Sequence, residues 1–313
     1  MATVSAATPA SDRCSLCGGG EFAVAYPGTS VEPAGAETVY RITHSSRNRI
    51  GGILRCCDCG LRILPECTTG SARYADALDL AYIADREQRI DNASLLLGTL
   101  PPETGGRLLD VGCACGFLLE AAARRGFQPV GVELSEWAVA YARREFGAEV
   151  HRGTLADQDF ANASFDVVVM ADVIEHLPDP VSELRRVYDL LRPGGLILIL
   201  TPDIGSLAAR LAGRHWWALL DDHHCYFSAA TIALLLRNCN FELRWCRALG
   251  RRFRLGHWVE KLSQYNRALY RVADSMCGGL QLRNVPVYFN MFDQMACLAA
   301  KPAGGQVTTG RCV

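Results

Sequence analysis

Residues 108–116 constrain the fold of this chain more than any other segment. They read Leu-Leu-Asp-Val-Gly-Cys-Ala-Cys-Gly, an apolar run that carries Asp110 and enters a turn of small residues. A second apolar run ends at Glu133, about twenty residues further on, after a helical segment. This arrangement is suited to a nucleoside ligand: one strand is followed by a turn of small residues that opens a helix, and a second strand ends in an acid. The turn lets the backbone approach the ligand, and the acid accepts hydrogen bonds from ribose hydroxyls.

This segment resembles motif I of the class I S-adenosylmethionine (SAM) dependent methyltransferases, whose usual form is Asp-x-Gly-x-Gly-x-Gly. The chain matches that form at Asp110, Gly112 and Gly116 and departs from it at Ala114. Because alanine carries a Cβ atom, Ala114 must adopt a negative φ or tolerate strain in the turn. The resemblance implies that the chain binds SAM at this turn.

The resemblance continues through the next predicted strand. Residues 165–170 read as a buried strand of β-branched residues, and residues 171–177 resemble the Asp-x-x-Glu-His-Leu segment of one methyltransferase branch. Asp179 suits the N-cap of a following helix, with Pro180 at its first position. The resemblance covers roughly residues 72–301.

We predict an α/β fold: a Rossmann-like, doubly wound, mostly parallel seven-stranded sheet whose last strand is antiparallel. Strands that alternate with helices favour such a sheet, and its ligands lie at the carboxyl ends of the strands. Ser135 and Ser228 suit helix N-caps. The predicted elements are strands 107–111, 129–133, 149–152, 165–170 and 196–201, helices 117–125, 135–146 and 180–191, and a closing hairpin of 285–289 and 295–300.

Composition limits the class of protein. Half of the 313 residues are hydrophobic and the net charge is −1, which gives no support for a nucleic-acid partner. Residues 1–12 lack a basic start and an apolar core, so we expect a disordered tail and no signal peptide. No apolar run approaches the roughly 18 residues that span a bilayer. We therefore expect a cytoplasmic chain whose buried cysteines, including Cys239 and Cys246, are free thiols.

Two Cys-x-x-Cys knuckles precede the methyltransferase-like region, each followed directly by glycine. Such a turn points two thiolates at one ion, so the pair predicts a tetrahedral Zn²⁺ site. The metal should be structural, because four thiolates leave no coordination position open. Cys57 and Cys67 are predicted bystanders. The predicted zinc ligands are Cys14, Cys17, Cys56 and Cys59.

The knuckles predict a zinc ribbon whose metal stabilises a core too small to be stable alone. Its expected strands are 39–43 and 53–55. A ribbon of this type precedes the methyltransferase core in a branch of the family that often acts on sugars, polysaccharides or secondary metabolites. The expected domains are a tail (1–12), the zinc ribbon (13–70), a SAM-dependent methyltransferase domain with C-terminal substrate-side insertions (71–302) and a second tail (303–313).

The resemblance also implies which residues contact SAM. Residues 72–99 read as a helix over the cofactor, where Tyr74, Tyr82 and Arg89 either contact SAM or the acceptor, or pack between helices. The expected SAM contacts are Asp110, Gly112, Cys113 and Gly116 at the methionine part, Glu133 at the ribose, Leu134, Thr154 and Leu155 at the adenine, and Met170, Ala171 and Asp172 at the amino-acid end.

Two histidines are candidate catalytic residues. Methyl transfer is an in-line displacement, and a hydroxyl acceptor must also lose a proton, for which histidine is the natural base near neutral pH. His176 follows the cofactor-facing strand. His223 lies in a segment resembling the family's Glu-His pair before Tyr-Phe-Ser, with Asp222 in place of the glutamate. We favour His223 as the base and keep His176 as second candidate; the alternative for each is a structural hydrogen bond.

The C-terminal part has a separate character. Residues 251–276 carry six basic side chains interleaved with aromatic ones, which predicts an amphipathic helix. Such a helix either contacts a membrane surface or an anionic acceptor, or has one solvated and one packing face.

The leading hypothesis is a SAM-dependent methyltransferase acting on a small molecule or glycan, with a hydroxyl oxygen favoured over carbon. A C-methyltransferase on a sugar or secondary metabolite is the first alternative. An RNA methyltransferase would need a basic ribbon face, and residues 1–70 hold six arginines but no lysine. In a non-catalytic SAM-binding scaffold the acceptor chemistry should be lost, whereas the segment around His223 is present. The oligomeric state does not follow from the sequence.

Overall fold

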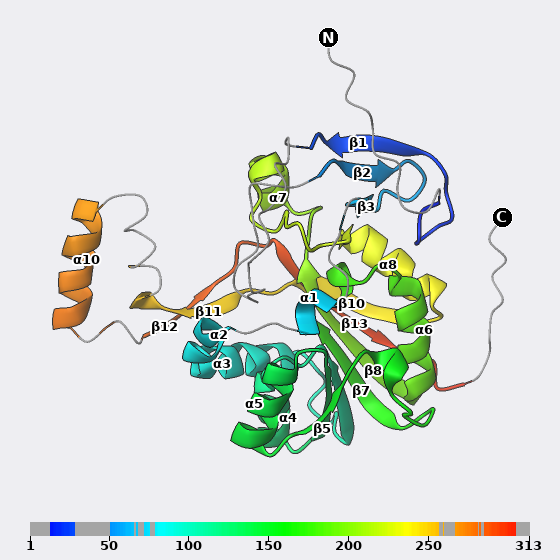
Figure 1. The fold of residues 1–313 in the computed structure, drawn as a ribbon, viewed down its shortest axis with the longest axis horizontal. Helices are drawn as coiled ribbons and strands as arrows, with labels where there is room; N and C mark the ends of the chain where they lie inside the picture. Colours follow the sequence, from blue (N-terminus) through cyan, green and yellow to red (C-terminus); the bar gives the residue numbers. More distant parts are fainter. Residues whose placement is uncertain are drawn as a thin grey trace, which may run out of the picture.

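Seven strands form the central sheet of this computed structural model, in the order β10-β13-β8-β7-β4-β5-β6 (Figure 1). β13 lies antiparallel between β10 and β8, and the other strands are parallel to one another, as predicted. The strands are β4 (Arg107–Val111), β5 (Gln128–Glu133), β6 (Glu149–Arg152), β7 (Phe165–Ala171), β8 (Leu191–Pro202), β10 (Glu242–Ala248) and β13 (Gln294–Ala300). The structure describes residues 13–28, 51–65, 67, 72–75, 79–256, 259, 267–280, 282 and 285–304.

Helices cover both faces of this sheet (Figure 1). The residues of β7 require helices on both faces. Val168 and Met170 pack into the core on one face of the sheet, and Val167 and Val169 pack into the core on the other. A strand buried on both sides reads as a continuous apolar run, which is the pattern seen in the sequence. One face is covered by α6 (Pro180–Leu190) and α8 (Ala229–Asn238), the other by α3 (Arg86–Leu97), α4 (Phe117–Arg124) and α5 (Glu136–Phe146).

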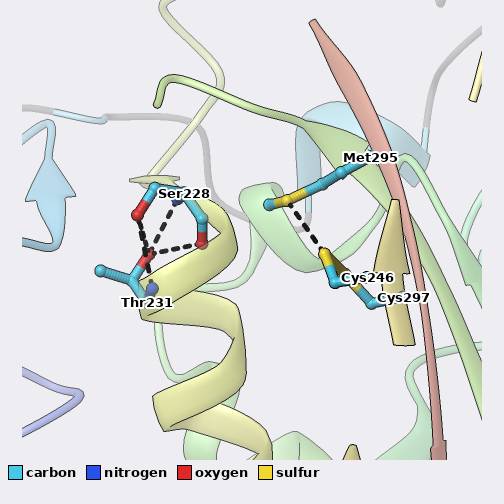
Figure 2. Close-up of a disulfide and its surroundings, with 5 residues drawn as sticks. All are labelled: Ser228, Thr231, Cys246, Met295 and Cys297. Carbon is cyan, nitrogen blue, oxygen red and sulfur yellow. Dashed lines mark hydrogen bonds between the residues drawn. A yellow bond between two sulfur atoms is a disulfide. The ribbon is translucent and has the colours of Figure 1, made fainter. Parts of the chain in front are cut away.

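The predicted helix starts are confirmed. The hydroxyl of Ser135 accepts a hydrogen bond from the α5 backbone at 3.2 Å, and Asp179 caps α6 at 3.0 Å with Pro180 in the first turn. Ser228 caps α8 in a reciprocal pair with Thr231 (Figure 2). Each cap accepts from a backbone N–H that the helix itself leaves without a partner.

The single helix predicted over residues 72–99 is wrong. The structure has α1 (Ala72–Ala75), α2 (Leu80–Ala84) and α3, which starts at Arg86. Asp79 sets one break, because its carboxylate accepts from the backbone N–H of Tyr82 at 3.0 Å and caps α2. Such local side-chain bonds favour a new helix start over continuation of an old one.

The C-terminal predictions also need correction. The predicted closing hairpin is wrong, because β13 pairs with β8 and β10 while β12 (Pro286–Phe289) pairs with β11 (Arg251–Arg254) in a separate two-stranded sheet. Residues 251–254 are therefore a strand, and exposure alternates along it as a strand requires. The later part of the predicted helix is confirmed as α10 (Arg267–Gly279), which stands away from the central sheet (Figure 1).

The N-terminal segment contributes three strands to a four-stranded sheet of the order β1-β2-β3-β9, in which β9 comes from the segment around residue 225. Its strands are β1 (Phe22–Tyr26), β2 (Ile53–Cys56), β3 (Arg62–Ile63) and β9 (Cys225–Tyr226). The predicted strand at 53–55 is confirmed, while 39–43 and the tail 1–12 lie outside the described residues. The remaining elements are α7 (Leu207–Ala212) and the 3-10 helices η1 (Leu155–Asp157), η2 (Ile174–His176) and η3 (Gly213–His215).

Cys246 is not the free thiol that we expected. The register of β10 against β13 places it opposite Cys297 with the Cα atoms 4.1 Å apart, and the two form a disulfide beside Met295 (Figure 2). Cys239 keeps a free, buried thiol as predicted. Among the described residues, no helix combines the length and the apolar character that crossing a bilayer requires.

Candidate SAM and acceptor site

The motif I turn is left-handed at three positions. Gly112, Ala114 and Gly116 have φ values of +72°, +45° and +80°. Ala114 therefore tolerates strain, of the order of 1 kcal/mol, instead of adopting a negative φ. The backbone N–H groups of Gly112 and Cys113 both donate to the carbonyl of Val132, at 2.8 and 3.1 Å, which ties the turn to the end of β5.

The Glu133 carboxylate lies directly beside this turn. Its two oxygens accept hydrogen bonds from the backbone N–H groups of Ala114 at 2.9 Å and Ser135 at 2.8 Å. Burial raises the pKa of Glu133, although these backbone N–H groups act in the opposite direction. The acid at the end of β5 and the small-residue turn after β4 thus come together as a ribose site requires.

Buried acids gather around the same end of the sheet. Asp110 is only 3% exposed, and burial together with the charge of Glu133 raises its pKa well above the usual range. Burial and the charge of Asp172 likewise raise the pKa of Glu175, although the hydroxyl of Thr201 donates to its carboxylate at 3.0 Å. Because a nearby cation would lower these pKa values, the residues fit the sulfonium and ammonium groups of SAM.

Asp172 holds two partners that the sequence did not indicate. It directly follows β7 with a φ of +55° and accepts hydrogen bonds from Gln294 at 2.7 Å and from Arg251 at 2.9 Å. Arg251 belongs to β11 and Gln294 to β13, so no local pattern relates either residue to Asp172. Arg251 brings a positive charge to the acidic edge of the sheet.

Tyr82 and Arg89 cover the start of α4. The Arg89 guanidinium lies 3.7 Å from the centroid of the Tyr82 ring, which stacks on Phe117 at 5.5 Å. Burial raises the pKa of Tyr82, with smaller contributions from the charges of Glu133 and Asp172. Contacts between helices are therefore observed, and a contact of Tyr82 or Arg89 with SAM stays a prediction.

The other predicted SAM residues differ in what they expose. The Leu155 and Met170 side chains are buried in the core, so only their backbones are available to a ligand. Cys113 is buried too, whereas Leu134 and Ala171 are half-buried. Thr154 precedes η1 and donates its hydroxyl to Asp157 at 2.7 Å.

The candidate catalytic histidines lie together. The rings of His176 and His223 meet edge to face with centroids 4.7 Å apart. His176 Nδ1 lies 3.0 Å from the backbone carbonyl of Asp222 and 2.9 Å from the Tyr74 hydroxyl. One donor atom each from His176, His223 and Glu175 falls within 4.8 Å of the others. The structure thus joins three segments that the sequence leaves far apart.

His223 is the more buried of the two histidines. Burial lowers its pKa to about 3, and the charge of His176 acts in the same direction, while Asp222 opposes both. The imidazole of His223 is therefore neutral at pH 7. Asp222 is also buried, and its carboxylate lies 4.0 Å from His223 Nε2.

The four knuckle cysteines converge on one point. Their sulfur atoms lie within 4.8 Å of one another, with Cys14–Cys59 and Cys17–Cys56 distances of 3.6 Å. A tetrahedron with Zn–S bonds near 2.3 Å has edges of about 3.8 Å, so this donor set fits Zn²⁺. The predicted bystanders Cys57 and Cys67 are not among the clustered donors.

Fold and site together define the class of Rossmann-like methyltransferases that use SAM. A model of the methyltransferase domain matches residues 82–244, just over half of the chain. The chain belongs to this methyltransferase domain family. The structure of a SAM-dependent methyltransferase from Archaeoglobus fulgidus shares the fold, with a TM-score of 0.50 and 18% identity over 71% of this chain and 100% of that chain.

Curated relatives match part of the chain. A ubiquinone biosynthesis O-methyltransferase of Ruegeria pomeroyi is 44% identical over 110 residues, which cover 34% of this chain and 44% of the relative. One of Xanthomonas euvesicatoria pv. vesicatoria is 35% identical over 152 residues, covering 44% of this chain and 64% of the relative. The chain thus spans less than two thirds of the length of these relatives.

Proposed function

We propose that the chain transfers the methyl group of SAM to a hydroxyl oxygen of a small molecule. The observation that carries this proposal is the cluster of His176, His223 and Asp222 beside the acidic cofactor edge of the sheet. The relatives named ubiquinone biosynthesis O-methyltransferase support oxygen as the acceptor atom. Sugar and glycan hydroxyls and secondary metabolites share this chemistry and belong in the same acceptor class.

In this proposal the cofactor-binding residues are those predicted from motif I. SAM supplies an electrophilic methyl group on a sulfonium when bound. Glu133 holds the ribose hydroxyls, and Asp110, the motif I turn and Asp172 surround the methionine part. The buried acids favour a cation at this edge, since each loses part of its own electrostatic penalty when positive charge arrives.

His223 removes the proton of the acceptor hydroxyl in this mechanism. Its lowered pKa keeps the imidazole unprotonated at neutral pH but also makes it a weak base, so proton transfer depends on stabilisation of the imidazolium. The Asp222 carboxylate, 4.0 Å from His223 Nε2, stabilises the imidazolium that forms. Orientation of the acceptor against the methyl group supplies the rest of the rate enhancement.

His176 is the second candidate base. The carbonyl of Asp222 only accepts hydrogen bonds, so the proton of the neutral His176 ring lies on Nδ1. Its Nε2 atom is then the basic nitrogen. With Nδ1 protonated, the Tyr74 hydroxyl oxygen, 2.9 Å from Nδ1, can only be a second acceptor of the same proton.

We also propose that Cys14, Cys17, Cys56 and Cys59 hold a structural Zn²⁺ in a ribbon over residues 13–70, ahead of the methyltransferase domain of residues 71–302. The convergence of the four sulfur atoms supports this assignment. With every coordination position occupied by sulfur, the metal stabilises the ribbon and takes no part in methyl transfer.

Turnover assays on a panel of acceptors test the proposed function. Wild-type protein, His223→Asn and His176→Asn are incubated with SAM and phenolic, sugar or aliphatic hydroxyl acceptors, and S-adenosylhomocysteine is quantified. We expect release that depends on a hydroxyl acceptor and falls at least roughly 100-fold in His223→Asn. SAM binding without turnover on any acceptor would overturn the proposal and favour a scaffold. Products methylated on carbon would assign the C-methyltransferase alternative.

A further inference from the structure

One strand of the N-terminal sheet comes from the acceptor site. β9 starts two residues after His223 and pairs antiparallel with β3, with Ile63 opposite Cys225 and Arg62 opposite Tyr226. Within the described part of the chain, β9 pairs with no other strand. The segment that carries His223 therefore has its β-sheet partner in the ribbon.

The loop of residues 220–226, here called the His223 loop, is held through its backbone carbonyls. Two of its donors, Leu64 and Cys67, come from the ribbon segment, and a third is the His176 ring. The Tyr226 hydroxyl closes the loop on itself. The bonds are Tyr226 Oη to Leu220 O at 2.7 Å, Cys67 Sγ to Asp221 O at 3.5 Å, His176 Nδ1 to Asp222 O at 3.0 Å and Leu64 N to His224 O at 3.1 Å.

The second cysteine knuckle forms the turn between β2 and β3. The Gly60 N–H donates to the carbonyl of Cys56 at 3.0 Å, and the Cys56 N–H donates to the carbonyl of Leu61 at 2.9 Å. β3 then lies between β2 and β9. The knuckle is therefore connected to β9 through one intervening strand. A metal held by these thiolates would lock the hairpin on which β9 is paired.

Apolar packing joins the same segments. Leu64 belongs to a buried cluster with Trp216, Leu219 and Tyr226, and Leu61 shares the main core with Phe227. The turn before the His223 loop and the residue after it therefore share buried, closely packed clusters with ribbon side chains. A shift of β3 would displace the loop backbone.

We propose that the ribbon is a positioning element for the acceptor site, with Leu64 and Tyr226 as positioning residues for His223 and His176. This inference rests on the proposed function of the two histidines. Leu64 fixes the loop from the ribbon side, and Tyr226 fixes it from within. A displacement of about 1 Å at a catalytic group costs roughly 100-fold in rate, so small losses of this support are measurable.

The test uses the full-length, zinc-loaded protein with ¹³C-labelled histidine side chains. Leu64→Ala removes apolar packing against the loop, and Tyr226→Phe removes only the hydroxyl bond to Leu220. The matched control is Tyr188→Phe on α6, whose ring packs on Phe241 and is in the contact pair of neither histidine. We expect the Cε1–H resonances of His176 and His223 to shift or broaden in Leu64→Ala and in Tyr226→Phe. In Tyr188→Phe neither resonance should change.

Kinetics give the second measurement. We expect kcat to fall roughly tenfold in Tyr226→Phe and further in Leu64→Ala, while the Kd for SAM stays within about threefold of wild type. Removing zinc with a chelator should produce the same resonance changes before the protein unfolds. Half-buried His151, on the edge strand β6, serves as an internal reference whose resonance should not move.

The outcomes distinguish failure of the positioning role of the ribbon from failure of the proposed catalytic role of the histidines. Unmoved His176 and His223 resonances in the folded variants would overturn the positioning role, whatever the activity. Shifted resonances with full activity in His223→Asn and His176→Asn would keep the structural link but remove the catalytic roles on which it rests. A parallel loss of SAM affinity and kcat would indicate general destabilisation and would also overturn the inference.

Discussion

The rings of His176 and His223 meet edge to face, with centroids 4.7 Å apart and planes inclined at 84°. Two imidazolium ions at this distance would repel each other, and burial adds to the cost of charging His223. One ring of the pair therefore stays neutral over the pH range in which most enzymes are assayed. Because the two rings differ in burial, the pH dependence of kcat can identify which histidine is the base.

We expect kcat to stay nearly constant between pH 8 and pH 5 if His223 is the base, because its pKa is lowered to about 3. A base with the ordinary histidine pKa of about 6.5 would lose most of its activity over this interval. The measurement is the pH profile of kcat with saturating SAM and acceptor. A fall in kcat over this interval that disappears in His176→Asn would assign the base to His176 instead.

His223 should also make stability depend on pH. Its folded pKa of about 3 lies below the unfolded value, so between pH 6.5 and 3 only the unfolded chain binds the proton. Stability is then complete above about pH 6.5 and falls as the pH is lowered, by about 1.4 kcal/mol per pH unit.

The comparison is between wild type and His223→Asn, since other buried acids titrate in both proteins. From pH 7 to pH 5 we expect the free energy of unfolding in urea to fall by about 2 kcal/mol more in wild type than in His223→Asn. Equal pH dependence in the two proteins would show that His223 keeps an ordinary pKa in the fold.

Glu133→Gln should weaken SAM binding. The carboxylate joins the motif I turn to the end of β5 through Ala114 and Ser135, and in the proposed site it accepts from the ribose. Hydrogen bonds to a charged group are worth about 1.5–3 kcal/mol, which corresponds to a loss of roughly 10- to 100-fold in affinity by calorimetry. Exposed Glu136, on the first turn of α5, supplies the control Glu136→Gln, for which affinity should be unchanged.

SAM binding should release protons. Burial raises the pKa of Asp110, Glu133 and Glu175 in the ligand-free protein, and a cationic ligand would lower these values again. Affinity for SAM should therefore rise with pH. Calorimetry in two buffers of different ionisation enthalpy measures the proton release, which should be smaller for S-adenosylhomocysteine because it lacks the sulfonium charge. Equal release for both ligands would contradict an electrostatic role of these acids.

Much of the fold was predictable because its signals are local. The apolar runs of the five central strands, the caps at Ser135 and Ser228, and the spacing of the cysteine knuckles each depend on residues close together in the chain. The positions of the motif I turn after β4 and of Glu133 at the end of β5 were predictable for the same reason, whereas their contacts with SAM stay predictions. At Ala114 the sequence allowed two backbone conformations, and the structure selects the strained one.

The remaining features depend on contacts between distant residues. β9 has two residues, too few for any periodicity, and it exists because β3 offers it a partner. The ion pair of Arg251 with Asp172 requires the arrangement of β11 against the sheet edge. The disulfide between Cys246 and Cys297 follows from strand register, which no local pattern sets.

Cys17→Ser should release the proposed zinc, whereas Cys57→Ser should not. The two cysteines are both exposed and belong to the same small sheet region, but only the Cys17 sulfur is part of the converging group. We expect about one zinc per chain by elemental analysis for wild type and Cys57→Ser, and little for Cys17→Ser. Because the ribbon shares its core with the methyltransferase domain, metal loss should lower Tm by roughly 5–10 °C.

A chelator should destabilise wild type and Cys57→Ser to the level of Cys17→Ser and have no further effect on Cys17→Ser. This pattern would show that Cys17→Ser is destabilised by loss of its zinc. If the serine were merely unfavourable and zinc stayed bound, a chelator would still destabilise the variant further. Equal zinc content in Cys17→Ser and Cys57→Ser would contradict the four-cysteine site, because three thiolates and a hydroxyl do not bind Zn²⁺ as four thiolates do.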